Sequence, residues 1–300
     1  MIAAVKAPGP LAQDALVHIP ARTPTSVIAA KMAEIGVIDD RNVFIVAAKL
    51  YNLQAPLQAG EYNIPAQARI DDVLSLMQSG KTWQRKFTVA EGLTSVEIAA
   101  ALKTQEGLTG DIGFTPPDGS LLPETYAFSF GDTREGIIAR MQKSMGAEIK
   151  RLWDARPENF ALKSQEEAVT LASIVEKETG IASERARVAG VFYNRLKAGI
   201  PLQSDPTVIY ALTMGETPMN RALTYNDLKT PSPYNTYVTP GLPPSAIANP
   251  GRASLEAVFS PETHEYIYFV ADGTGGHVFA KTLKEHNDNV AKWRRIRAGK

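Results

Sequence analysis

Residues 164–180 read SQEEAVTLASIVEKETG, and this stretch predicts the central helix of the molecule. Ser164 followed three positions later by Glu167 is a capping box, which begins a helix by satisfying its free backbone amides. Gly180 ends the pattern. At about 100° per residue, the apolar side chains between these ends form a broad arc that must pack against other elements. The arc consists of Ala168, Val169, Leu171, Ala172, Ile174 and Val175.

Two glutamates near the end of this helix are candidate catalytic residues. On a helical wheel, Glu176 and Glu178 both lie at the margins of the apolar arc. Apolar surroundings raise the pKa of a carboxyl group, as a general acid requires near neutral pH. Glu178 is the favoured acid for two reasons. It lies in the last turn, where the helix dipole raises the pKa of a carboxyl group further, and it is followed by Thr179, whose hydroxyl could support a bound sugar or water. The alternative is that one or both glutamates pair with Arg185 or Arg187.

Periodicity and turn residues predict an α+β fold around this helix, with a small N-terminal module and a larger second domain. Asp40 and Ser183 are predicted N-caps, and Pro24 is a predicted first helical residue. Two regions rich in proline and glycine, residues 105–135 and 200–252, are predicted to be mostly loop. Strands are predicted at residues 16–20, 60–65, 266–270 and 277–279, and further helices at residues 24–34, 40–50, 70–78, 134–153, 183–198 and 283–296.

One strand–helix unit occurs twice. Residues 89–102 (VAEGLTSVEIAAAL) align without a gap with residues 19–32 (IPARTPTSVIAAKM). Both copies read as a strand end, a small turn and a helix that carries Ile-Ala-Ala. The second copy has its own capping box, Thr94 with Glu97.

The composition excludes several classes of function. The 300 residues include no cysteine, which rules out thiol catalysis, cysteine-ligated zinc and disulfides. The net charge is +0, so nothing indicates a nucleic-acid partner. The four histidines are far apart and show no metal-ligand spacing, so neither a metal nor another cofactor is expected. The sequence contains no run of about 20 apolar residues, which is the length that a membrane-spanning helix needs.

A polar turn within residues 202–210 (LQSDPTVIY) is a candidate binding segment. Gln203, Ser204 and Asp205 precede Pro206, which suits the first position of a helix. Asp205 is then the predicted N-cap, and capping alone would explain it. The functional alternative is a turn that binds substrate.

Residues 232–251 (SPYNTYVTPGLPPSAIANPG) form a long predicted loop that suits a sugar ligand. Tyr234 and Tyr237 flank Asn235, so rings can stack on sugar faces while the amide bonds hydroxyl groups. A loop this long without secondary structure is uncommon unless it is functional. The alternative is a surface loop that proline keeps rigid. His277, on a short predicted hairpin, favours a structural role over a catalytic one.

At these stretches the chain resembles the YceG-like family. LLPETY at 121–126 resembles the family's Pro-acid-Thr-Tyr loop, and the resemblance covers nearly the whole chain from about residue 7. The other matching motifs are ASIVEKE (172–178), ASER (182–185), VFYNRL (191–196), LQSDPTVIY (202–210), YNTY (234–237), GLPPSAIANPG (241–251) and FVADGTGGHVF (269–279).

The resemblance implies a domain organisation and a reaction. Residues 14–85 would be a LysM-like module associated with peptidoglycan binding, residues 86–300 the catalytic domain, and residues 1–13 a linker or remnant. The family reaction is endolytic, non-hydrolytic cleavage of the β-1,4 bond between N-acetylmuramic acid and N-acetylglucosamine, which leaves a 1,6-anhydro end. The family's catalytic glutamate falls on Glu178, with Glu176 as the neighbouring candidate.

The resemblance also implies partners and a location. It implies that glycan strands of peptidoglycan are the substrate, and it suggests cell-wall synthases as further partners. The expected location is the periplasmic side of the inner membrane. Family members carry an N-terminal membrane anchor, so the resemblance implies membrane attachment, although no anchor is expected within these residues. Two alternatives stay open: a hydrolytic muramidase that uses Glu178 and Asp205, and a peptidoglycan-binding protein without catalytic activity.

Overall fold

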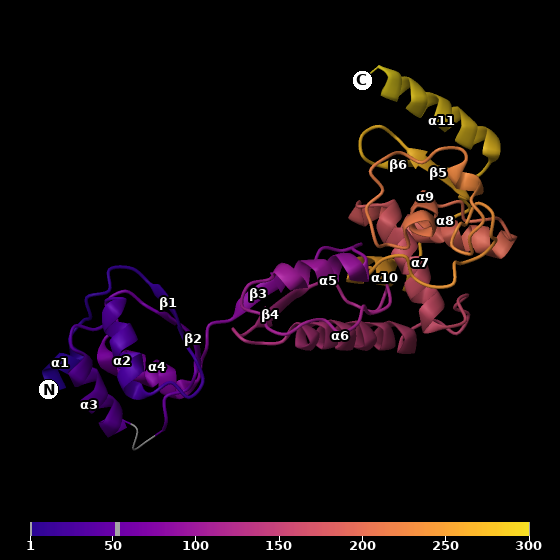
Figure 1. Ribbon diagram of the computed structural model, residues 1–300. Helices are drawn as coiled ribbons and strands as arrows, with labels where there is room; N and C mark the ends of the chain where they lie inside the picture. The colour runs from indigo at the N-terminus through magenta and orange to yellow at the C-terminus, as the bar shows by residue number, and fades with distance from the viewer. Residues whose placement is uncertain (1, 52–54, 300) are drawn as a thin grey trace. The chain divides into compact units, whose positions relative to one another are not determined.

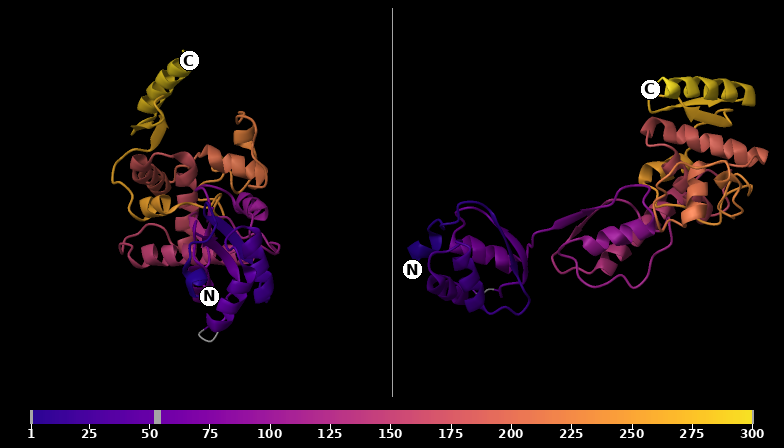
Figure 2. Two further views of the ribbon diagram at one scale, coloured as in Figure 1. Left: turned by 90° about the vertical axis from the view of Figure 1, so that its left-hand side faces the viewer. Right: turned by 45° about the horizontal axis from the view of Figure 1, so that its top comes forward.

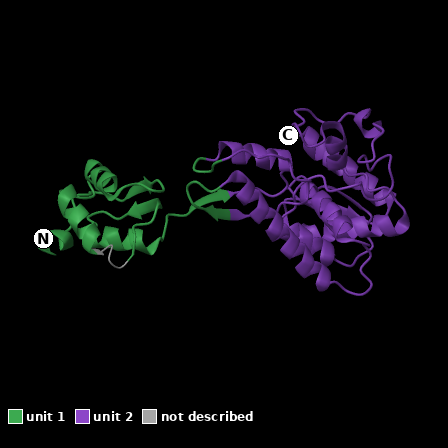
Figure 3. Cartoon of the chain, turned by 60° about the horizontal axis from the view of Figure 1, so that its bottom comes forward, with its two compact units in different colours: residues 1–87, 106–109, 126–132 green, residues 88–105, 110–125, 133–300 purple. Residues whose placement is uncertain are grey.

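The computed structural model describes residues 2–51 and 55–299. Two compact units make up the chain (Figure 3): unit 1 comprises residues 1–87, 106–109 and 126–132, and unit 2 comprises residues 88–105, 110–125 and 133–300. Helices and short strands occur in both (Figure 1), which confirms the predicted α+β class. Across the described residues the strands form three two-stranded sheets.

Unit 1 contains four helices and one antiparallel pair of strands, and helices α2 and α3 lie between the two strands in the chain. Its strands β1 and β2 are antiparallel, with Ala15 opposite Ile64 and Ile19 opposite Gly60. Alternation along β1 places Val17 and Ile19 in the core, while Leu16 is exposed. The elements in order are α1 (Ile2–Lys6), β1 (Ala15–Ile19), α2 (Thr25–Glu34), α3 (Arg41–Tyr51), β2 (Gly60–Ile64) and α4 (Ile70–Ser79). The identity of this unit as a LysM-like module stays a prediction.

Unit 2 is mostly helical. Strand β3 (Arg85–Thr88) pairs with β4 (Thr125–Phe128), and the division between the units crosses both strands. The elements of unit 2 are α5 (Ser95–Thr104), α6 (Arg134–Asp154), α7 (Gln165–Glu178), η1 (Ala182–Glu184), α8 (Arg185–Ala198), α9 (Asp205–Thr213), η2 (Asp227–Lys229), α10 (Arg252–Phe259), β5 (Tyr268–Ala271), β6 (His277–Ala280) and α11 (Leu283–Ala298).

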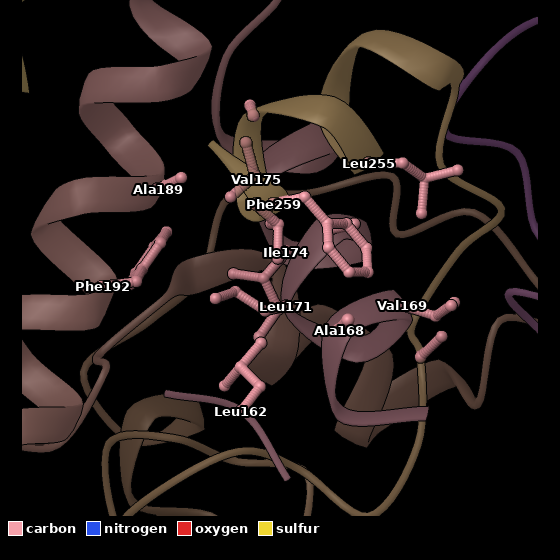
Figure 4. Close-up of a cluster of buried hydrophobic side chains, with 14 of the residues drawn as sticks. Leu162, Ala168, Val169, Leu171, Ile174, Val175, Ala189, Phe192, Leu255 and Phe259 are labelled. Carbon is pink, nitrogen blue, oxygen red and sulfur yellow. The ribbon is translucent and has the colours of Figure 1, made fainter. Parts of the chain in front are cut away.

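Helix α7 is the centre of unit 2. All eight residues from Ala168 to Val175 are buried, so the helix is covered on every side over two turns. Helices α6, α8, α9 and α10 all contact it. Side chains such as Leu171, Ile174 and Phe192 form the core at these contacts (Figure 4). The helix predicted from residues 164–180 is therefore confirmed as the element around which unit 2 packs.

The hairpin β5–β6 and helix α11 lie together in unit 2 (Figure 2). The strands are antiparallel, with Ala271 opposite His277 across the turn. Capping-box bonds between Thr282 and Glu285 begin α11. No described helix combines the length and the apolar character that crossing a bilayer requires.

Most predicted elements are confirmed within one or two residues, and three local predictions are wrong. Ser183 does not cap a helix, because it lies inside η1, from which α8 continues. Pro24 is the N-cap of α2 rather than its first residue. The N-cap role of Asp205 is also wrong, for a reason given below. Helix α10 had no counterpart among the predicted elements. The repeated unit is confirmed, since a helix follows shortly after both β1 and β3.

Candidate active site

The site begins at the carboxyl end of α7. The Ser164 hydroxyl accepts a hydrogen bond from the Glu167 amide and starts the helix. Glu178 is its last residue, because Thr179 adopts an extended conformation with φ −142°. The buried Thr179 hydroxyl then accepts a bond of 3.0 Å from the Ile181 amide, which fixes the chain as it leaves the helix. The buried helix and the fixed main chain that follows it therefore hold the Glu178 side chain in position.

Burial raises the pKa of the Glu178 carboxyl from 4.5 to about 7. The nearby charge of Asp205 raises it too, whereas the hydrogen bond from Ser204 and the charges of His277 and Arg195 lower it. Although protein surrounds the carboxyl, Glu178 keeps partial exposure to solvent. A carboxyl group with these properties can hold a proton near neutral pH and still be reached by a substrate.

The Ser204 hydroxyl donates a hydrogen bond of 2.6 Å to Oε1 of Glu178. A buried hydroxyl network holds Ser204 in place: its amide donates to Thr236 Oγ1 at 3.0 Å, and Thr207 Oγ1 donates to its carbonyl at 2.6 Å. Gln203, just before it, adopts a left-handed φ of 48°, which is costly for a residue with a side chain. Its amide donates to the Thr236 carbonyl at 3.1 Å, so the same loop holds the strained turn.

Asp205 is not a helix cap. Helix α9 begins at Asp205 itself, with Ser204 in the N-cap position and no side-chain cap bond. The Asp205 carboxylate instead accepts a bond of 2.6 Å from the Tyr237 hydroxyl. The predicted cap fails because both oxygen-bearing side chains at this helix start have distant partners, Glu178 and Tyr237. Asp205 is exposed beside Glu178, where a substrate can contact it.

The loop of residues 232–251 contributes Tyr237 to the site and holds itself rigid through its other polar groups. Asn235 is fully buried, and its Nδ2 donates to the carbonyls of Leu228 and Thr230. Its Oδ1 accepts from the Tyr237 amide at 2.9 Å. The Tyr234 hydroxyl bonds to Ser245 at 2.8 Å. Asn235 and Tyr234 therefore support the loop in this conformation, while Tyr237 reaches Asp205.

Glu176 belongs to a different network from Glu178. Its Oε2 accepts a bond of 2.9 Å from the Gly251 amide, and its Oε1 lies 3.7 Å from the Arg185 guanidinium. The ion-pair alternative is thus confirmed for Glu176 and Arg185. Since residues two positions apart on a helix point in nearly opposite directions, the two carboxyl groups have separate surroundings.

Arg195 is a site residue that the sequence analysis missed. It is 7% exposed, and its guanidinium donates to the Ile267 carbonyl at 2.6 Å and to the Leu202 carbonyl at 2.9 Å. It thereby joins the segment before β5 to the segment before Ser204. Val188 and Phe192 precede it on the same buried face of α8. A charged residue at such an apolar position could have marked it in the sequence. Within residues 2–51 and 55–299, no group of three or more His, Asp or Glu side chains could hold a metal ion.

Comparison with known proteins identifies relatives of this chain. The model of the YceG-like family matches residues 17–292. A Bacillus subtilis (strain 168) protein named endolytic murein transglycosylase is 34% identical over 92% of this chain and 84% of its own length. A protein of the same name from Streptococcus pneumoniae serotype 2 (strain D39) is 28% identical over 92% of this chain, which spans 58% of that relative.

A solved structure supports the same relationship. The crystal structure of a yceG-like protein from Listeria monocytogenes is similar to this chain with a TM-score of 0.59 and 34% sequence identity. The similarity covers 92% of this chain and 98% of that one. The fold, the sequence motifs and the relatives agree, and the chain belongs to the YceG-like family.

Proposed function

We propose that this chain is an endolytic peptidoglycan lytic transglycosylase in which Glu178 is the general acid and then the general base. The observation that carries the proposal is the Glu178 carboxyl, whose pKa burial raises to about 7 at the partly exposed end of a buried helix. The relatives named endolytic murein transglycosylase support the activity and its peptidoglycan substrate. Asp205, Ser204 and Tyr237 are the proposed neighbours of Glu178 in the site, and Gln203 lies beside them in the same turn.

In the first step the protonated Glu178 carboxyl donates its proton to the bridging oxygen of the glycosidic bond as that bond breaks. Ser204 occupies Oε1, and Oε2 has no protein partner among the described residues, which leaves it for the substrate. The donated hydrogen bond from Ser204 then stabilises the carboxylate that forms.

In the second step the Glu178 carboxylate takes the proton from the C6 hydroxyl of N-acetylmuramic acid. The freed oxygen bonds to the anomeric carbon, which closes the 1,6-anhydro ring. The carboxyl returns to its protonated form, so one group serves both steps and no water is consumed. A pKa of about 7 suits this exchange, because both protonation states are then accessible near neutral pH.

The proposed setting follows from the substrate. An enzyme that cuts cell-wall glycan acts in the cell envelope, and we place it on the periplasmic side of the inner membrane, held by an anchor outside these residues. Residues 14–85 would act as a LysM-like module that holds the glycan. Cell-wall synthases that produce nascent strands are the proposed partners.

Mass spectrometry of the products from purified glycan strands tests the reaction. Wild type should release anhydro-ended fragments, and Glu178→Gln should release none while it keeps its fold, because glutamine cannot donate a carboxyl proton. Equal cleavage by Glu178→Gln would reject the site.

A hydrolytic muramidase is the second candidate, because Asp205 is exposed beside Glu178 and does not cap α9. Its fragments would be heavier by one water, and Asp205→Asn would abolish cleavage. For the transglycosylase, Asp205→Asn should reduce turnover only partly, since Asp205 would not exchange protons with the substrate.

A further inference from the structure

A histidine that the proposed reaction does not use lies close to Glu178. His277 is the first residue of β6, and its Nδ1 lies 2.8 Å from Oε2 of Glu184. The His277 amide also donates to Oε1 of Glu184 at 3.0 Å. The carboxylate therefore holds both the ring and the backbone of this residue, which leaves the ring little freedom to rotate.

Several features bring His277 and Glu178 into one site. Glu184 follows Glu178 by six positions, and the Thr179 hydroxyl fixes the connection between them. Arg195 joins the Ile267 carbonyl, next to β5, to the segment that carries Ser204. Strand β5 pairs with β6, where His277 begins. In agreement with this placement, a charge on His277 lowers the pKa of Glu178.

The turn before β6 is built to hold His277 in one position. Oδ1 of Asp272 accepts bonds from the Thr274 amide at 2.7 Å and the Gly276 amide at 3.1 Å. At Gly276, a Cβ atom would lie 2.9 Å from Glu184 Oε1, so only glycine lets the turn approach Glu184 without displacement. The ring of Phe269 meets the His277 imidazole edge-on, with centroids 5.3 Å apart.

The other ring nitrogen is free. Nε2 of His277 has no hydrogen-bond partner among the described residues, and it is not one of the buried atoms that lack a partner, so solvent reaches it. In the neutral imidazole, Glu184 favours the tautomer with its proton on Nδ1. Nε2 then carries a lone pair that faces outward and can accept a hydrogen bond.

We propose that His277 is a further substrate-binding residue of this site: its Nε2 accepts a hydrogen bond from a sugar hydroxyl of the bound glycan, and Glu184 positions the ring. The inference rests on the proposed function, since the ligand is the glycan that Glu178 cleaves. An imidazole at this position would orient the sugar relative to the Glu178 carboxyl without exchanging a proton with it.

Two substitutions test the roles of the two ring nitrogens of His277 separately. His277→Asn keeps an N–H group about where Nδ1 lies and removes Nε2, whereas His277→Gln keeps a polar group near Nε2 and weakens the contact with Glu184. We expect His277→Asn to lower turnover of purified glycan strands about tenfold, the usual effect of one lost transition-state hydrogen bond, and His277→Gln to lower it less. Thermal unfolding of both should stay close to wild type.

His264 provides a matched control. Its Nε2 lies 2.9 Å from the Arg187 carbonyl and its Nδ1 accepts from the Tyr266 amide, so main-chain groups occupy both ring nitrogens. His264→Asn should lower the unfolding midpoint and leave turnover per folded molecule unchanged.

Affinity for glycan, measured in the inactive Glu178→Gln background, completes the test. Adding His277→Asn should weaken binding of purified glycan strands about fivefold, as expected for one lost hydrogen bond. Unchanged turnover and unchanged affinity in folded His277→Asn would overturn the proposal. If wild type releases no anhydro-ended product, the proposed reaction fails, but the affinity comparison still decides whether His277 contacts glycan.

Discussion

Replacing Glu178 with glutamine should change the stability of unit 2 in a pH-dependent way. Glutamine has nearly the same shape, and its amide oxygen can still accept the hydrogen bond from Ser204. It carries no charge at any pH. The wild-type carboxyl, with its pKa raised by burial to about 7, must ionise inside the folded protein at high pH. The variant removes that unfavourable ionisation.

The size of the effect follows from the two pKa values. Because the folded protein holds the Glu178 proton more tightly than the unfolded chain, the stabilisation is fully present below about pH 4.5 and is lost as the pH rises through about 7. At about 1.4 kcal/mol per tenfold change in a protonation constant, the loss approaches about 3 kcal/mol by about pH 8. Solvent contact at this partly exposed carboxyl reduces the figure, so about 3 kcal/mol is an upper limit.

Urea unfolding of wild type and Glu178→Gln at about pH 5 and about pH 8 measures this difference. Fluorescence of Trp153 reports on unit 2, because its ring packs at right angles to those of Phe160 and Phe259. Glu178→Gln should gain stability over wild type between the two pH values, by up to about 3 kcal/mol, while it loses all cleavage. A difference in unfolding free energy that is the same at both pH values would refute the raised pKa and with it the assignment of the acid.

Two further substitutions test the hydrogen bond to Glu178 and the packing of α8. Ser204→Ala removes the hydrogen bond that lowers the pKa of Glu178, so the basic limb of the pH–rate profile should move to higher pH and turnover should fall about tenfold; an unmoved limb would contradict the role of Ser204. Gly190→Ala would put a Cβ atom 2.4 Å from the Glu262 carbonyl oxygen. This clash should lower the free energy of unfolding, measured with urea, by about 1–3 kcal/mol. An unchanged urea midpoint would show that the main chain at Glu262 can move away at no cost.

Local sequence rules predicted most helices of unit 2, α10 excepted, because those helices begin and end through local interactions. The N-cap at Ser164 and the apolar spacing of residues 168–175 predict α7 without any distant contact, although the predicted capping box forms only in part, because the Glu167 carboxylate accepts from the Lys163 amide instead of the Ser164 amide. Its burial on every side goes beyond the amphipathic pattern, since side chains as polar as Thr170 and Ser173 are also buried. Ser173 Oγ donates to the Thr170 carbonyl at 2.7 Å and accepts from the Ile247 amide at 3.0 Å, and the second partner is 74 residues away. Only the folded structure reveals such a partner.

The side chains of the candidate site also have partners that are distant in the sequence and that local rules do not predict. Capping propensity assigned Asp205 to the start of α9, but propensity ranks alternatives only when no stronger partner competes. Tyr237, 32 positions later, provides that partner. The pairing of His277 with Glu184 spans 93 positions and leaves no pattern in the sequence. The residue types of the site were therefore predictable from its motifs, and their hydrogen bonds were not.

Glu176 and Glu178 illustrate how partners, rather than sequence position, divide the roles of two similar side chains. Both are carboxyl groups on the last turn of one helix, and the pattern placed both at the margin of its apolar face. Glu176 accepts a hydrogen bond from the Gly251 amide, which ties the loop of residues 232–251 to α7, and it lies beside the Arg185 guanidinium. Glu178 has no ion pair among the described residues, and the one hydrogen bond it receives from them comes from the neutral Ser204 hydroxyl, so burial dominates and raises its pKa.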